Sequence, residues 1–202
     1  MQLNHARRSG GFSLVELMVA LVVGLIVVGA VLALITAIMK SNRETLQSTR
    51  LNQELRATMA VIAGDLRRSR GVGDPLTIAT SAGGNPYKVI DTSTAGCAVY
   101  AYDGAPDGDC RAISVGTGAV WLGAAAPTGG ACAVDCDDAK GGTQLNSDQV
   151  VISRLEFTPE SASATVREFE ITIEGHLVDT NPDVSAITRT LTQKIFVRSV
   201  GE

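Results

Sequence analysis

Apolar residues fill the chain from position 12 to position 39, and Glu16 is the only formally charged residue in this stretch. An α-helix rises 1.5 Å per residue, so the stretch would measure about 42 Å as a helix. Crossing the hydrocarbon core of a bilayer requires about 30 Å. The pattern therefore predicts one long helix that can span a membrane.

No proline interrupts residues 40–70, so we expect the helix to continue beyond the apolar stretch. Apolar residues recur there at spacings of four, four, three and four, which places them on one helical face. They are Leu51, Leu55, Met59, Ile62 and Leu66. Four charged residues fall away from that stripe and are expected to face water or neighbouring subunits: Arg50, Glu54, Asp65 and Arg68. Gly71, Gly73 and Asp74-Pro75 are predicted to end the helix.

The last third of the chain alternates apolar and polar residues and is rich in β-branched side chains, which is typical of strands. Strands are predicted over 149–157, 165–178 and 187–200, with a turn at Asn181-Pro182-Asp183 before the last. In the middle strand, Phe169, Ile171 and Ile173 face one way, and Glu168, Glu170, Thr172 and Glu174 face the other. We expect these strands to form an antiparallel sheet against the outer helix.

The middle of the chain, residues 76–148, has weaker patterns. A strand is predicted at 97–102, and a hairpin over 111–115 and 119–122 around Gly116-Thr117-Gly118. Trp121 is expected to pack within the domain. The stretches 103–109 and 129–142 are expected to be loops.

Charge is distributed unevenly along the chain, whose formal net charge is −4. Residues 40–70 hold seven Lys or Arg against three acids, a net of +4, whereas residues 71–202 hold eight against seventeen, a net of −9. An acidic domain, in a chain with only 4% aromatic residues overall, is a poor general nucleic-acid binder.

Catalytic motifs are absent from the sequence: it has no phosphate loop, no metal-binding histidine pair and no serine nucleophile elbow. His176 has no catalytic companion, because the other histidine lies at position 5. We therefore expect no enzymatic activity, no cofactor and no small-molecule substrate.

Four cysteines lie beyond the apolar segment, at Cys97, Cys110, Cys132 and Cys136. An even number in an exported domain indicates two disulfides. Three pairings are open; short loops favour Cys97 with Cys110 and Cys132 with Cys136. The spacing lacks the paired C-x₂-C signature of a zinc site.

A carboxylate-rich stretch contains the candidate calcium ligands Asp103, Asp107 and Asp109. It lacks the EF-hand pattern, and a pair of Asp-Gly turns is the favoured interpretation. No metal site is therefore assigned there.

Glu16 needs a cationic partner, because a carboxylate within a membrane segment costs about 2.5–3.5 kcal/mol on insertion scales. The residues within helical reach of it are uncharged. Cutting the chain after Gly11 would create a free amino group on Phe12. Within one helix that amine and the carboxylate lie along the axis, so a pairing between neighbouring chains is favoured.

The stretch Arg7-Arg8-Ser9-Gly10-Gly11-Phe12-Ser13-Leu14-Val15-Glu16-Leu17, with the apolar helix behind it, resembles the class III signal of type IV pilins and of the pseudopilins of type II secretion. An ordinary secretory signal has an apolar region about half as long and is removed whole. A twin-arginine signal or a plain single-pass anchor explains Glu16 poorly.

The resemblance implies that prepilin peptidase cuts between Gly11 and Phe12 and methylates the new terminus. It implies that Glu16 is the assembly carboxylate. It also implies the α+β type IV pilin fold, a long amino-terminal helix packed on an antiparallel sheet. The expected divisions are a leader at 1–11, a transmembrane or filament-core helix at 12–39, its amphipathic outer half at 40–72 and a periplasmic head at 73–202.

Looser motifs beyond residue 40 resemble PilW-type minor pilins and the related J-type minor pseudopilins. The anchor lacks the proline usual in major pilins, which also favours a minor subunit. The resemblance implies an inner-membrane subunit that primes type IV pilus assembly, remains at the pilus tip, and serves twitching motility, adhesion or DNA uptake. Implied partners are other minor pilins, major pilin, prepilin peptidase and the inner-membrane assembly platform. A type II secretion pseudopilin and a membrane-tethered binding or adhesion module are the alternatives.

Overall fold

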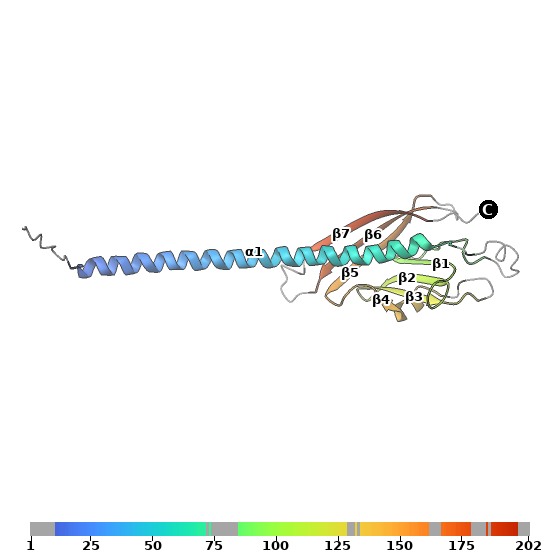
Figure 1. The fold of residues 1–202 in the computed structure, drawn as a ribbon, viewed down its shortest axis with the longest axis horizontal. Coiled ribbons are helices and arrows are strands. Elements are labelled where there is room, and N and C mark those ends of the chain that lie inside the picture. The colour runs from blue at the N-terminus through green and yellow to red at the C-terminus, as the bar shows by residue number, and fades with distance from the viewer. Residues whose placement is uncertain are drawn as a thin grey trace, which may run out of the picture. The chain divides into compact units, whose positions relative to one another are not determined.

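The computed structural model describes residues 11–71, 73, 85–128, 132, 134–161, 167–178, 185 and 187–197. They form one long helix and antiparallel β-structure, which is the α+β arrangement expected from the sequence (Figure 1). The chain divides into two compact units, Met1–Leu46 and Gln47–Glu202. The predicted turn at 181–183, the Asp74-Pro75 helix stop and residues 198–200 of the last predicted strand lie outside the described residues.

Helix α1 runs from Leu14 to Arg68 without interruption, as the proline-free sequence predicts. It ends just before the predicted glycine stop, because Arg70 adopts the left-handed conformation with a φ of 61°. The Gly71 amide then donates to the Arg68 carbonyl at 2.9 Å, and the Arg70 amide donates to the Ala101 carbonyl at 2.8 Å. The end of the helix is thereby fixed to the strand that contains Ala101.

The first sheet has four strands in the order β1-β2-β3-β4, all antiparallel. Their bounds are Cys97–Ala101, Cys110–Gly116, Ala119–Ala125 and Thr143–Gln144. The predicted 97–102 strand and the hairpin are confirmed. In the two-residue hairpin turn Thr117 and Gly118 both have positive φ, 52° and 79°, which suits the right-handed twist of the paired strands.

One expected loop contains regular structure. The 3-10 helix η1, Asp138–Gly141, lies within the predicted loop 129–142 and is followed directly by β4. It approaches β3 so closely that a β-carbon built on Gly123 would lie 2.7 Å from the Ala139 Cα. A stretch this short has too little periodicity to reveal itself in the sequence.

The second sheet has three antiparallel strands in the order β5-β6-β7, with bounds Val150–Pro159, Glu168–Leu177 and Thr188–Phe196. The predicted alternation in the middle strand is confirmed, since Phe169, Ile171 and Ile173 are fully buried. A register shift between Ile152 and Arg154 interrupts the alternation of β5.

One hydrophobic core joins the head, and it contains residues of α1 and of both sheets. The predicted helical stripe is confirmed, because its five apolar side chains are at most 4% exposed. The buried Asn146 side chain accepts a hydrogen bond from the Val120 amide at 2.7 Å and donates one to the Val150 carbonyl at 2.8 Å. This side chain connects the first sheet to the second.

Candidate functional site

The predicted processing and assembly residues lie at the start of α1. Gly11 and Phe12 precede the helix, and the Phe12 side chain is 84% exposed. The Leu17 amide donates to the Ser13 carbonyl at 3.1 Å, which closes the first turn. Glu16 is exposed in that turn, where the helix dipole favours a carboxylate. The cleavage, the methylation and the assembly role of these residues remain predictions.

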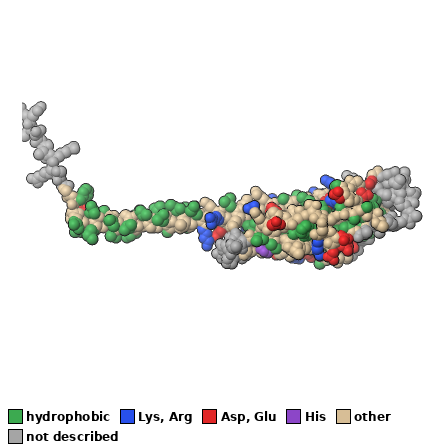
Figure 2. Space-filling model, turned by 90° about the horizontal axis from the view of Figure 1, so that it is seen from below, with side chains coloured by type: hydrophobic (Ala, Val, Ile, Leu, Met, Phe, Trp, Pro, Cys, Tyr) green, Lys and Arg blue, Asp and Glu red, His purple; other side chains and the backbone are tan. Residues whose placement is uncertain are grey.

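The apolar part of α1 presents its side chains outward on every face. Each Leu, Val, Ile and Met from Leu14 to Met39 is at least 46% exposed, and Figure 2 shows this surface of hydrophobic side chains. The most apolar window of α1 has a mean hydropathy of 3.1, and α1 is the one helix among the described residues that meets the length and composition required to cross a membrane. So large an apolar surface calls for lipid or neighbouring helices around it.

A buried polar cluster in the head overturns one prediction. Asp65 does not face water; it is 9% exposed and accepts hydrogen bonds from the hydroxyls of Tyr100 and Tyr102, the latter at 2.6 Å. Arg111 Nε lies 3.4 Å from the same carboxylate. Another Arg111 nitrogen donates to the Pro106 carbonyl at 3.0 Å.

Burial and the adjacent Asp65 carboxylate raise the pKa of both tyrosine hydroxyls, because each favours the neutral phenol. The tyrosines therefore remain hydrogen-bond donors to Asp65. The cluster joins α1 to β1 and β2 by charged and polar contacts, in addition to the apolar core. The cluster is therefore a structural connection that fixes the end of α1 to β1 and β2.

The four cysteines form two disulfides, but the favoured pairing was wrong. Cys97 pairs with Cys136, and Cys110 pairs with Cys132. In the β1–β2 ladder, Cys97 lies opposite Ser114, whereas Cys110 lies opposite Ala101. Cys97 and Cys110 are thus at opposite ends of the ladder, about 13 Å apart at about 3.3 Å per residue, too far for a disulfide.

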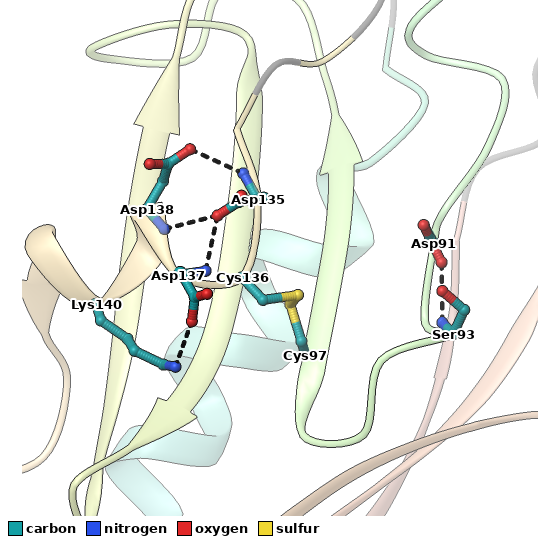
Figure 3. The surroundings of a disulfide bond; sticks show 8 residues. All are labelled: Asp91, Ser93, Cys97, Asp135, Cys136, Asp137, Asp138 and Lys140. Atoms are coloured by element: carbon teal, nitrogen blue, oxygen red, sulfur yellow. Dashed lines mark hydrogen bonds and ion pairs between the residues drawn. A yellow bond between two sulfur atoms is a disulfide. The ribbon is translucent and has the colours of Figure 1, made fainter.

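Acidic residues flank Cys136 of the Cys97–Cys136 disulfide, and Figure 3 shows Asp135, Asp137 and Asp138 on that side of the bond. The Asp135 carboxylate accepts hydrogen bonds from the amides of Asp137 and Asp138, both at 2.8 Å, and these amides lower its pKa. Lys140 pairs with Asp137 at 2.6 Å. These contacts fold the segment around Cys136 into a compact turn.

The candidate calcium ligands make hydrogen bonds within the protein. Asp103 accepts one from the Gly73 amide at 3.0 Å, and Asp109 accepts one from the Tyr87 hydroxyl at 2.7 Å and one from the Gly104 amide at 3.1 Å. Asp107 adopts a turn conformation with a φ of 66°. Within the described part of the chain, no group of three His, Cys, Asp or Glu side chains is arranged to hold a metal ion.

Two further residues that the sequence singled out have ordinary structural places. Trp121 is half-buried in β3, and its ring nitrogen donates to the Gly116 carbonyl at 3.2 Å. His176 is half-buried near the end of β6, opposite Val151 on one side and Thr188 on the other. The described structure brings neither residue into a catalytic group.

Comparison with known protein families assigns both parts of the chain. Residues 6–32 match the prokaryotic N-terminal methylation motif, and residues 44–197 match the family described as prepilin peptidase-dependent protein B. No curated protein and no solved structure gives a match. The methylation motif and the single apolar helix are those of a membrane-anchored pilin. The chain belongs to the prepilin peptidase-dependent protein B family, and it is a structural subunit of the pilin or pseudopilin type.

Proposed function

We propose that this chain is a PilW-like minor pilin, a non-enzymatic subunit that helps to start type IV pilus assembly and remains at the pilus tip. Its partners in this proposal are other minor pilins and major pilin, and its head faces the periplasm before assembly. The observation that carries the proposal is the lone carboxylate of Glu16 in an apolar segment that matches the methylation motif. A carboxylate within a membrane segment costs free energy, so a helix that served only as an anchor would be more stable in the membrane without Glu16.

The mechanism follows from the chemistry of the first helical turn. Prepilin peptidase would release the amino group of Phe12, one turn before the Glu16 carboxylate. In a growing filament the carboxylate of an entering subunit would pair with the Phe12 amine of its neighbour. Ion pairing in an apolar environment is strong, so it offsets the cost of holding each charge among hydrocarbon. The apolar side chains would then exchange lipid for the helices of other subunits.

The decisive variant is Glu16→Ala, with Glu44→Ala as the matched control. Glu44 is also an exposed carboxylate on α1, but it lies outside the apolar segment. The Glu16 variant should enter the membrane normally, because it removes a charge from the segment. It should be lost from sheared filaments, whereas the Glu44 variant should be incorporated. Incorporation of both variants at the wild-type level would refute the mechanism.

The phenotype of a deletion strain separates the three candidate roles. A minor pilin predicts loss of surface pili with normal protein secretion. A type II secretion pseudopilin, which shares the methylation motif, predicts the reverse. A tethered binding module predicts that both processes continue while attachment to a surface or ligand is lost.

A further inference from the structure

The two disulfides are nested along the chain. Cys97 pairs with Cys136, and the Cys110–Cys132 bond lies inside that closure. Cys97 and Cys110 come first in the sequence, so they are the first cysteines to be exported behind the amino-terminal helix. The native structure gives each of them a partner that is exported later.

An unfolded chain favours different bonds. The probability of closing a loop falls as about the 3/2 power of its length, so Cys97 meets Cys110, 13 positions away, about fivefold more often than Cys136, 39 positions away. Cys132 and Cys136 are only four positions apart. Oxidation before the head folds therefore favours the sequential pairs, which are Cys97 with Cys110 and Cys132 with Cys136.

The strands that complete the core are exported after all four cysteines. The core residues of β1 and β2 pack in one cluster with those of β5 and β6, and β5 begins at Val150, beyond the last cysteine. An isolated two-stranded hairpin is marginally stable in water. The cysteines are therefore open to oxidation before the β1–β2 register can hold Cys97 and Cys110 apart.

We propose that the head of this chain is a substrate of a thiol–disulfide isomerase in the periplasm. The inference rests on the proposed function for one point, the export of the head. A disulfide oxidase would first take two electrons and two protons from each pair of thiols and leave the sequential bonds. These bonds join Cys97 to Cys110, which the β1–β2 ladder places about 13 Å apart, so the mispaired chain cannot complete the first sheet.

Three thiolate exchanges convert the sequential bonds to the native bonds without net oxidation. The isomerase thiolate attacks Cys97 Sγ, forms a mixed disulfide and releases the Cys110 thiolate. Cys110 attacks Cys132 Sγ, which forms one native bond and releases the Cys136 thiolate. Cys136 then attacks the mixed disulfide at Cys97, which forms the second native bond and regenerates the isomerase thiolate.

Folding protects the native bonds once they have formed. Cys97 is 2% exposed and Cys110 is fully buried in the folded head. A thiolate must reach the sulfur that it attacks, so these bonds are shielded, whereas a mispaired chain that cannot fold stays open to the isomerase. Burial thereby selects the native pairing.

Peptide mapping of the full-length protein, purified from cells with and without the isomerase, tests the proposal. Free thiols are blocked with N-ethylmaleimide, and trypsin is then added without reductant. Trypsin releases residues 89–111 and 112–140, and each of these peptides contains two of the cysteines. Native bonds keep the two peptides linked, whereas sequential bonds leave them separate. Cleavage before Asp103 and Asp135 then distinguishes the native pairs from the remaining pairing.

Separate peptides should be at least fivefold more abundant in the cells without the isomerase. The matched control, Cys110→Ser with Cys132→Ser, leaves only Cys97 and Cys136 and so has no wrong partner. The amount of this oxidised variant should not change when the isomerase is removed. A loss of wild-type protein that the variant escapes would also support the proposal, because misfolded chains are degraded.

Two results would contradict the proposal in different ways. Natively linked peptides at equal yield in both kinds of cell would overturn this inference and leave the proposed function intact. Four blocked thiols in both kinds of cell would show that the head is not exported, and they would overturn the proposed function as well.

Discussion

Removing the Asp65 carboxylate should destabilise the head more than any exposed charge change. In Asp65→Ala the Arg111 guanidinium, in a residue that is 7% exposed, loses its ion-pair partner. The hydroxyls of Tyr100 and Tyr102 lose their acceptor as well. Breaking a buried pair by removing one partner costs about 3–5 kcal/mol. That is a large share of the about 5–15 kcal/mol by which a domain is stable.

Thermal unfolding of the full-length protein in detergent, followed by near-ultraviolet circular dichroism, measures the effect. A loss of 3–5 kcal/mol corresponds to about 6–20 °C in Tm at about 2–4 °C per kcal/mol. The control Asp137→Ala, which removes an exposed carboxylate that pairs with Lys140, should cost at most about 1 kcal/mol.

Two further variants keep the test informative if Asp65→Ala does not fold. Tyr102→Phe removes one hydrogen bond to the charged carboxylate and should cost about 1.5–3 kcal/mol. Asp65→Leu combined with Arg111→Met removes both buried charges, so it should be more stable than Asp65→Ala. An Asp65→Ala protein within 1 °C of the wild-type Tm would refute the assigned role of the cluster.

Other expectations concern pH, the disulfides and backbone packing. The pKa values of Tyr100 and Tyr102 are raised in the folded protein, so the stability of the head should not depend on these tyrosines below about pH 10. Above about pH 10 stability should fall, because the tyrosines ionise first in the unfolded chain. Urea unfolding at a series of pH values should show a shallower fall in Tyr100→Phe. Replacing Cys110 and Cys132 by serine removes a disulfide whose cysteines are 22 residues apart in the sequence. This should lower the free energy of unfolding, measured in urea, by about 3 kcal/mol. Gly123→Val should lower Tm, because its side chain would collide with the backbone of η1 at Ala139.

Local patterns were sufficient to predict most of the fold. The helix follows from a proline-free run with one apolar stripe, and β6 follows from strict alternation around Phe169, Ile171 and Ile173. Both patterns are periodic over ten residues or more, so a single residue that breaks the period does not hide them. Strand β4 and helix η1 are short and were missed for that reason.

Long-range contacts explain the two wrong predictions. The partners of Asp65 lie 35 to 46 residues further along the chain, so the sequence shows only a charge beside an apolar stripe. The disulfide pairing depends on the β1–β2 register and on the position of the segment near Cys136, whereas the preference for short loops ignored both. The roles of Gly11, Phe12 and Glu16 at the start of α1 depend on cleavage of the chain, so they stay predictions that a measurement of the mature amino terminus tests.

In the proposed mechanism, Glu16 acts together with an amino group created by processing. Mass spectrometry of the protein purified from cells with an active prepilin peptidase measures its amino terminus directly. We predict a chain that begins with N-methylated Phe12. A protein that retains residues 1–11 in those cells would contradict it.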